Sequence, residues 1–138
     1  MNHQAIELQL IEHQVRPTAV RIVVWAALAE RTQPFTLKDV EGWLPYMDRS
    51  SIFRTLRLLA AQQLLHEIDD GSGVGKYCVC HCPAHRHVSH VHFLCTQCQR
   101  TECLPQVEVP HLPMPAGYRA IEAEQLVKGI CPKCSRKA

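Results

Sequence analysis

The feature that most constrains the fold is a pair of Cys-x-x-Cys sequences, Cys95 to Cys98 and Cys131 to Cys134. The two-residue spacing lets both thiolates of a pair face one ion while backbone amides donate hydrogen bonds to sulfur. Two such pairs complete a tetrahedral site of four sulfur ligands, which closes the coordination of the metal and favours structural Zn²⁺. The pairs are farther apart than in a zinc ribbon. We therefore expect the ion to join the beginning and the end of one domain.

The eight cysteines also admit other interpretations. A Cys-x-x-Cys pair can be redox-active, and a thiol can be inert. A thioredoxin-like pair requires a βαβ context, which the flanking sequence lacks. No apolar run approaches the ~18 residues needed to span a bilayer. The N-terminal residues 1–14 are polar and lack the apolar core of a secretory signal. These features predict a cytoplasmic protein without a membrane partner, whose thiols stay reduced and available to metal.

A second group of histidines and cysteines offers ligands for another ion. His90 and His92 lie two residues apart in the alternating segment 88–94, so a strand would project both imidazoles to one side. Cys80 ends one predicted strand, and His66 lies in its predicted partner. An ion bound by His66, Cys80 and one of the two later histidines would tie a hairpin to the second domain. Thiolate and imidazole donors suit Zn²⁺ better than Fe²⁺ or Mn²⁺.

The other candidates in this region have simpler interpretations. His81, His85 and His87 can be solvated hinge residues. Cys78 and Cys82 can be ordinary small residues or a spare metal site. Cys103 can be a packed thiol.

Hydrophobic periodicity and turn signals predict a run of helices followed by a hairpin in the first part of the chain. The expected helices are residues 3–14, 18–30, 36–44 and 48–61, and the expected strands are 64–68 and 76–80. This order is typical of a winged helix-turn-helix. We expect that domain to span 1–82, a hinge at about 81–87, and a second domain at 88–138, with strands in 88–94 and 118–130 and an irregular proline-rich stretch at 105–115.

A net charge of +2 does not by itself indicate a nucleic-acid partner. The distribution is more informative, because Arg49, Arg54 and Arg57 lie in a window, 49–63, that contains no acid. On a helix in the major groove, arginine can pair with guanine or contact phosphate. The alternative is a solvated face whose arginines form salt bridges with Asp48 or Glu67.

Four phrases in the right order resemble the ferric uptake regulator (Fur) family along nearly the whole chain. Residues 15–21, VRPTAVR, resemble the family's L-R-x-T-x-x-R phrase. Residues 50–56, SSIFRTL, resemble its S-x-x-T-V-Y-R-x-L recognition helix, with Phe53 at the usual tyrosine. Residues 90–98, HVHFLCTQC, resemble H-x-H-x-x-C-x-x-C, and the late Cys-x-x-Cys follows.

The resemblance implies an α+β fold, with an N-terminal winged-helix domain, a hinge and a small α/β dimerisation domain held together by a four-cysteine zinc site. It implies a homodimer on palindromic double-stranded operator DNA, with metal as corepressor. The matching structural zinc ligands are Cys95, Cys98, Cys131 and Cys134. The matching regulatory ligands, most like those of zinc uptake regulators (Zur), are His66, Cys80, His90, His92 and Cys103, with either His66 or Cys103 completing the site. The matching DNA-binding residues are Arg16, which resembles a residue that reaches toward the minor groove, and Arg49, Ser50, Ser51, Phe53, Arg54 and Arg57.

Departures from the family pattern narrow the expected function. Iron and peroxide sensors carry a ligand on the loop before the helix at 36–44, and residues 33–35, QPF, offer no such donor. The prolines of 105–115 disfavour the helix that the family places in its dimerisation domain. We therefore expect a zinc-responsive repressor of metal-uptake genes, with one structural and one regulatory zinc per subunit.

Three alternatives remain. The first is an iron, manganese or peroxide sensor of the same family, and the second is a zinc-containing interaction module without DNA binding. The third is a zinc hydrolase, which would need an open coordination position and a general base. No H-E-x-x-H sequence or carboxylate near the histidines supports catalysis, so we expect neither an enzyme nor a small-molecule substrate.

Overall fold

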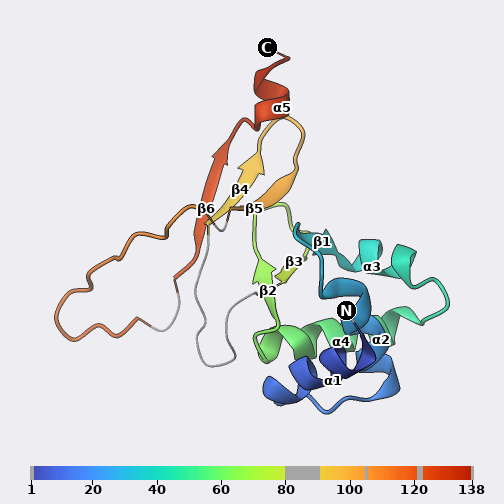
Figure 1. The fold of residues 1–138 in the computed structure, drawn as a ribbon. Coiled ribbons are helices and arrows are strands. Elements are labelled where there is room, and N and C mark those ends of the chain that lie inside the picture. The colour runs from blue at the N-terminus through green and yellow to red at the C-terminus, as the bar shows by residue number, and fades with distance from the viewer. Residues whose placement is uncertain (1, 80–90, 105, 121–122, 138) are drawn as a thin grey trace. The chain divides into compact units, whose positions relative to one another are not determined.

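The computed structural model describes residues 2–79, 91–104, 106–120 and 123–137 (Figure 1). The chain divides into a first unit, Met1–His87, and a second unit, Val88–Ala138. The expected hinge at 81–87 lies outside the described residues. Within the described part of the chain, no helix has the length and apolarity to cross a membrane.

The first unit begins with two capped helices. Helix α1 spans His3–Glu12, and the side chain of Asn2 accepts a hydrogen bond from the amide of Ala5 at its start. Helix α2 spans Ala19–Leu28, and Thr18 caps it in the same way. Such caps satisfy amides that have no partner inside the helix. The buried residues of the two helices are Ile6, Leu10, Val24, Trp25 and Leu28.

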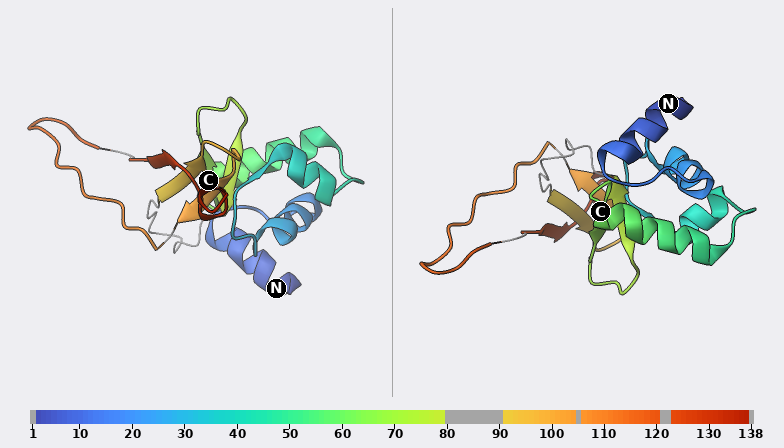
Figure 2. Two further views of the ribbon diagram at one scale, coloured as in Figure 1. Left: turned by 90° about the horizontal axis from the view of Figure 1, so that it is seen from above. Right: turned by 90° about the horizontal axis from the view of Figure 1, so that it is seen from below.

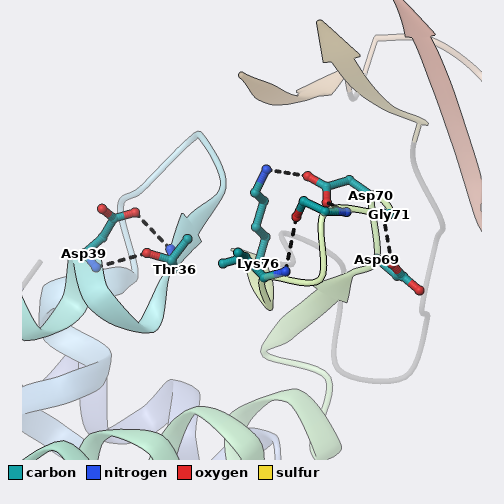
Figure 3. Close-up of polar contacts among 8 residues, drawn as sticks. Thr36, Asp39, Asp69, Asp70, Gly71 and Lys76 are labelled. Atoms are coloured by element: carbon teal, nitrogen blue, oxygen red, sulfur yellow. Dashed lines mark hydrogen bonds and ion pairs between the residues drawn. The ribbon is translucent and has the colours of Figure 1, made fainter. Parts of the chain in front are cut away.

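Two further helices follow a short strand. Strand β1, Phe35–Thr36, leads directly into helix α3, Leu37–Trp43. Thr36 and Asp39 each accept a hydrogen bond from the other's backbone amide, which forms a capping box (Figure 3). Helix α4 spans Arg49–Ala61 and buries Ile52, Thr55, Leu56 and Leu59. These observations confirm the four predicted helices within a few residues.

A small sheet completes the first unit. Strands β2, Leu65–Ile68, and β3, Lys76–Val79, form an antiparallel hairpin, and β1 pairs with the other edge of β3. At the base of the hairpin loop the ammonium of Lys76 contacts the buried carboxylate of Asp70 (Figure 3). Helix α2 packs on α1 and α4, and α3 packs on α4; Figure 2 shows these helices from two opposite sides. This arrangement confirms the predicted winged helix-turn-helix.

The second unit is built around three strands. Strand β4, Val91–Cys95, pairs antiparallel with β5, Thr101–Leu104, and parallel with β6, Gln125–Gly129, so that β4 is central. Helix α5, Pro132–Ser135, is a single turn. Among the described residues, the apolar core cluster lies entirely in the first unit. The described apolar residues that the second unit buries are Val91, Leu94, Cys95, Cys103 and Cys131.

The second unit differs in detail from the sequence prediction. Strand β5 and helix α5 were not predicted, and neither was β1 of the first unit, because each is at most four residues long and carries too little periodicity. The strand expected in 118–130 is limited to β6, since Tyr118 closes a turn with Pro115. Residues 106–120 contain neither helix nor strand, as the prolines predict.

Candidate metal centre

The sheet of the second unit brings the two cysteine pairs to the same edge. Cys95 is the last residue of β4, and its register partner in the parallel strand β6 is Gly129. Just beyond, Thr96 donates hydrogen bonds from its amide and its hydroxyl to the carbonyl oxygen of Gly129, at 2.8 and 3.1 Å. Because parallel strands end at the same edge, Cys131 emerges beside Cys95. Cys131 occupies the N-cap position of α5, and the turn of that helix carries Cys134.

The four thiols fit a tetrahedral zinc ion. The sulfur atoms of Cys95, Cys98, Cys131 and Cys134 all lie within 4.8 Å of one another. The sulfurs of Cys98 and Cys131 are 3.8 Å apart. A tetrahedron with four Zn–S bonds of about 2.3 Å has S···S edges of about 3.8 Å. The donor set and its spacing therefore match a closed four-thiolate site.

Backbone amides stabilise negative charge on one of these sulfurs. The amides of Cys98 and Cys131 donate to Sγ of Cys95, at 3.5 and 3.4 Å. These donors lower the pKa of Cys95 to about 6. The pKa of Cys134 is raised to about 12, first by its side-chain hydrogen bond to Cys131 and then by desolvation. Thiolates are the form that binds a metal ion, so the donors to Cys95 favour the protonation state that coordination requires.

A basic cleft of about 570 Å³ opens beside the cysteines. Its charged lining residues are Arg100, Glu102, Lys133, Arg136 and Lys137. Arg100 and Glu102 pair with each other at 3.3 Å. A zinc ion with four thiolates carries a net charge of −2. The excess of cations in the cleft lowers the electrostatic cost of that charge.

Two of the other predicted ligands, His66 and His92, each lie opposite a cysteine on a neighbouring strand, one pair within each unit. In the first unit, His66 of β2 lies opposite the buried Cys78 of β3. In the second unit, His92 of β4 lies opposite the buried Cys103 of β5. Directly opposed residues have Cβ atoms about 4.5–5.5 Å apart, so each pair brings a histidine and a cysteine side chain to neighbouring positions on one face of its sheet. Cys80 and His90 lie outside the described residues.

Cys78 is the residue of this group that sequence reasoning left without a role. No sequence signal identified it, because the register of the hairpin decides which residue faces His66. That register depends on the turn at residues 69–75, whose length and geometry the sequence pattern does not fix.

Helix α4 presents an exposed basic surface. Its core residues lie on one face, and the opposite face exposes Arg49, Ser50, Phe53, Arg54 and Arg57, while Ser51 is half-buried. Arg57 lies over the ring of Phe53, with 5.8 Å between the guanidinium carbon and the ring centroid. Arg49 forms an ion pair with Glu41 of α3 at 3.1 Å, which differs from the acidic partners considered from sequence. Arg16 is exposed in the connection between α1 and α2.

The two serines of α4 contribute to its N-terminus. The hydroxyls of Ser50 and Ser51 donate to the carboxylate of Asp48 at 2.6 and 2.8 Å, and the amide of Ser51 donates at 3.0 Å. These hydrogen bonds, with Ser50 first, lower the pKa of Asp48 to about 2. The cap therefore stays ionised across the neutral range and fixes where the basic helix begins.

Comparison with known proteins identifies the family that has this architecture. The family model of the ferric uptake regulator family matches residues 12–112. The ferric uptake regulation protein of Synechococcus elongatus is 29% identical over 91 residues, which cover 63% of this chain and 59% of that protein. The chain thus matches somewhat over half the length of this curated relative.

Solved structures show the same fold at low sequence identity. A zinc uptake regulator complexed with zinc and DNA has a TM-score of 0.67 at 15% identity, and the match covers 99% of this chain and 97% of that chain. Holo XcZur has a TM-score of 0.65 at 18% identity and covers 98% and 99%. The Helicobacter pylori regulator Fur, described as having three functional metal-binding sites, has a TM-score of 0.65 at 13% identity and covers 98% and 95%. With the family model extending over most of the residues, these matches establish that the chain belongs to the ferric uptake regulator family.

Proposed function

We propose that this chain is a zinc-responsive repressor that binds operator DNA as a homodimer and controls metal-uptake genes. The observation that carries the proposal is the exposed face of α4, where Arg54 and Arg57 flank Phe53. In a winged-helix unit this helix is the element that can enter a major groove. Arginine there reads guanine or holds phosphate, and the aromatic ring offers an apolar surface to a thymine methyl group.

Zinc is the proposed metal at both sites. The four-thiolate cluster is the proposed structural site, because its spacing matches Zn–S geometry and it leaves no position for substrate. The proposed regulatory ligands are His66, Cys80, His90, His92 and Cys103. A set of imidazole and thiolate donors favours Zn²⁺ over Fe²⁺ and Mn²⁺. A solved zinc uptake regulator of the same fold holds zinc and DNA together, which supports the same coupling here.

The proposal is tested by operator binding across a range of buffered metal concentrations. Fluorescence anisotropy should show tight binding with Zn²⁺ and weak binding once exchangeable zinc is removed, while metal analysis still finds one zinc per subunit. Activation by Fe²⁺ or Mn²⁺ and not by Zn²⁺ would instead assign the chain to the iron, manganese or peroxide sensors. Absence of binding to any operator in a random-sequence selection would leave the interaction module as the function.

Two substitutions separate the DNA surface from the sensor. Arg54→Ala should weaken operator binding by about 10- to 100-fold without changing zinc content, whereas Lys38→Ala, an equal loss of charge on α3, should have little effect.

Cys80→Ala should abolish the zinc response and leave the structural zinc in place, whereas Cys82→Ala should respond normally. A normal zinc response in Cys80→Ala would remove that residue from the regulatory site.

A further inference from the structure

The N-terminus of α4 is occupied by an acidic side chain of the protein itself. Amides at the start of a helix are a favoured site for phosphate, because they have no partner inside the helix. Here the carboxylate of Asp48 takes that place, since it accepts hydrogen bonds from the amide and hydroxyl of Ser51 and from the hydroxyl of Ser50. Its pKa of about 2 keeps it ionised at neutral pH. A DNA phosphate approaching this end of the helix therefore meets negative charge.

A second carboxylate lies beside the same end of the helix. Glu41 of α3 pairs with Arg49, the first residue of α4, with 3.1 Å between Oε1 and Nη1. The two helices pack against each other (Figure 1). The side chain of Glu41 is 32% exposed and that of Arg49 is 70% exposed, so the acid is held against the protein and the base extends into solvent. A guanidinium has five N–H donors, so Arg49 can bind a second acceptor while it keeps its contact with Glu41.

The charge of α4 changes sign along the helix. At its start, the carboxylates of Asp48 and Glu41 outnumber the one guanidinium of Arg49. Farther along, Arg54 and Arg57 lie in the window 49–63, which contains no acid. Ion pairs between exposed side chains stabilise a fold only weakly, so the pair of Glu41 with Arg49 contributes little to folding. Its larger effect is on the acceptors that Arg49 can bind.

The charge balance of the first unit makes the state of each arginine important for DNA binding. Residues 1–79 contain eight Lys and Arg residues and nine Asp and Glu residues. Binding to DNA of any sequence depends on the number of phosphates that cations neutralise. Discrimination between sequences depends instead on contacts with base edges. An arginine that is paired with an acid therefore adds less to binding that is independent of sequence.

We propose that Glu41 is a specificity-determining residue, which holds Arg49 and keeps phosphate from the start of α4. This inference rests on the proposed DNA binding and assigns a residue that discriminates the operator from other DNA. On the operator, Arg49 keeps its contact with Glu41 and uses its remaining donors, while Arg54 and Arg57 contact bases or phosphate. On other sequences α4 is not seated in the groove, and Arg49 reaches a phosphate only by giving up Glu41. The carboxylate thus weakens binding to the wrong DNA more than binding to the operator.

Fluorescence anisotropy of the zinc-loaded full chain tests this role on two duplexes. One is the tightest-binding duplex from a random-sequence selection, and the other is a scrambled duplex of the same length and composition. Glu41→Gln, which keeps the shape and removes the charge, should tighten binding to the scrambled duplex and steepen its salt dependence by about one unit. The ratio of the two affinities should fall by about threefold or more. Glu41→Asp, which restores the charge, should recover most of the ratio.

The matched control is Glu12→Gln, an equal change of charge at an exposed position of α1, and it should leave the ratio unchanged. An unchanged ratio in Glu41→Gln would overturn the role of Glu41. A wild-type chain with equal affinity for both duplexes would instead refute the proposed function itself.

A double-mutant cycle shows whether Glu41 acts through Arg49. In an Arg49→Ala background, Glu41→Gln should no longer steepen the salt dependence on the scrambled duplex, because the arginine that would join a phosphate is absent. A change of the same size as in the wild-type background would overturn the assignment, since Glu41 would then act on DNA directly. Zinc content and the urea midpoint of each variant are measured in parallel and should match those of the wild type.

Discussion

The first unit buries a continuous cluster of large side chains, including Trp25, Leu28, Ile52 and Leu56, whereas the described residues of the second unit bury few apolar side chains larger than cysteine. The first unit thus has the hydrophobic burial that drives folding of ordinary small domains. The second unit has three short strands whose ends converge on four thiols. The comparison teaches that one family fold can combine apolar burial in one half with a cluster of four thiols able to hold a metal ion in the other.

The largest expected effect is the loss of a thiol ligand. Cys131→Ser should unfold the second unit, because structural zinc contributes on the order of 10 kcal/mol or more in small zinc domains. Hydrogen exchange on the full chain should show loss of protection in 91–104 and 125–135 and retained protection in α2 and α4. Cys82→Ser is the matched control. A Cys131→Ser variant with a protected second unit would show that apolar packing suffices there.

Acid should separate the two units through their different protonation chemistry. Zinc binding requires deprotonated thiols, so it weakens as pH falls. The pKa of Asp48 is lowered to about 2 from its ordinary value of 3.8, so the stability from that cap is present above pH 3.8 and is lost only as pH falls through about 2. At pH 4.5 we therefore expect zinc release and an intact α4, measured by a zinc dye and by circular dichroism. Simultaneous loss of both signals would show that the units do not respond separately.

Truncation in the apolar core should affect the first unit alone. Leu56→Ala removes a fully buried side chain of α4 and should destabilise that unit by about 2–5 kcal/mol. Urea unfolding followed by tryptophan fluorescence measures the change, because both tryptophans, Trp25 and Trp43, lie in the first unit. Zinc content should remain one structural ion per subunit. Loss of that ion in the folded variant would mean that the core of the first unit supports the cysteine site.

The smallest effect is expected at the N-terminus of α4. Asp48→Ala removes the acceptor for the hydroxyls of Ser50 and Ser51 and should lower the midpoint of urea unfolding only slightly. The same urea titration detects this change in stability. The control is Asp69→Ala, which removes an equal charge, because the carboxylate of Asp69 accepts only a local hydrogen bond in the β2–β3 loop. An effect at position 48 no larger than at 69 would show that the cap contributes little beyond its charge.

The sequence by itself determined the winged-helix order, the α+β class and the pairing of two Cys-x-x-Cys sequences. These features depend on local periodicity, capping residues and ligand spacing, which are written in short stretches of the chain. Thr36, Asp48 and Thr18 are examples, since each marks a helix start that the structure shows.

Tertiary structure alone decided the features that depend on pairing between distant segments. Strand β5 is too short to be recognised by periodicity and exists because its backbone groups pair with β4. The register of β2 with β3 chose Cys78 as the neighbour of His66, and the parallel pairing of β4 with β6 carried Cys131 to Cys95. A one-residue slip in either register would turn these side chains to the opposite face, and no local pattern forbids it. Only the hydrogen-bonded sheets fix that choice.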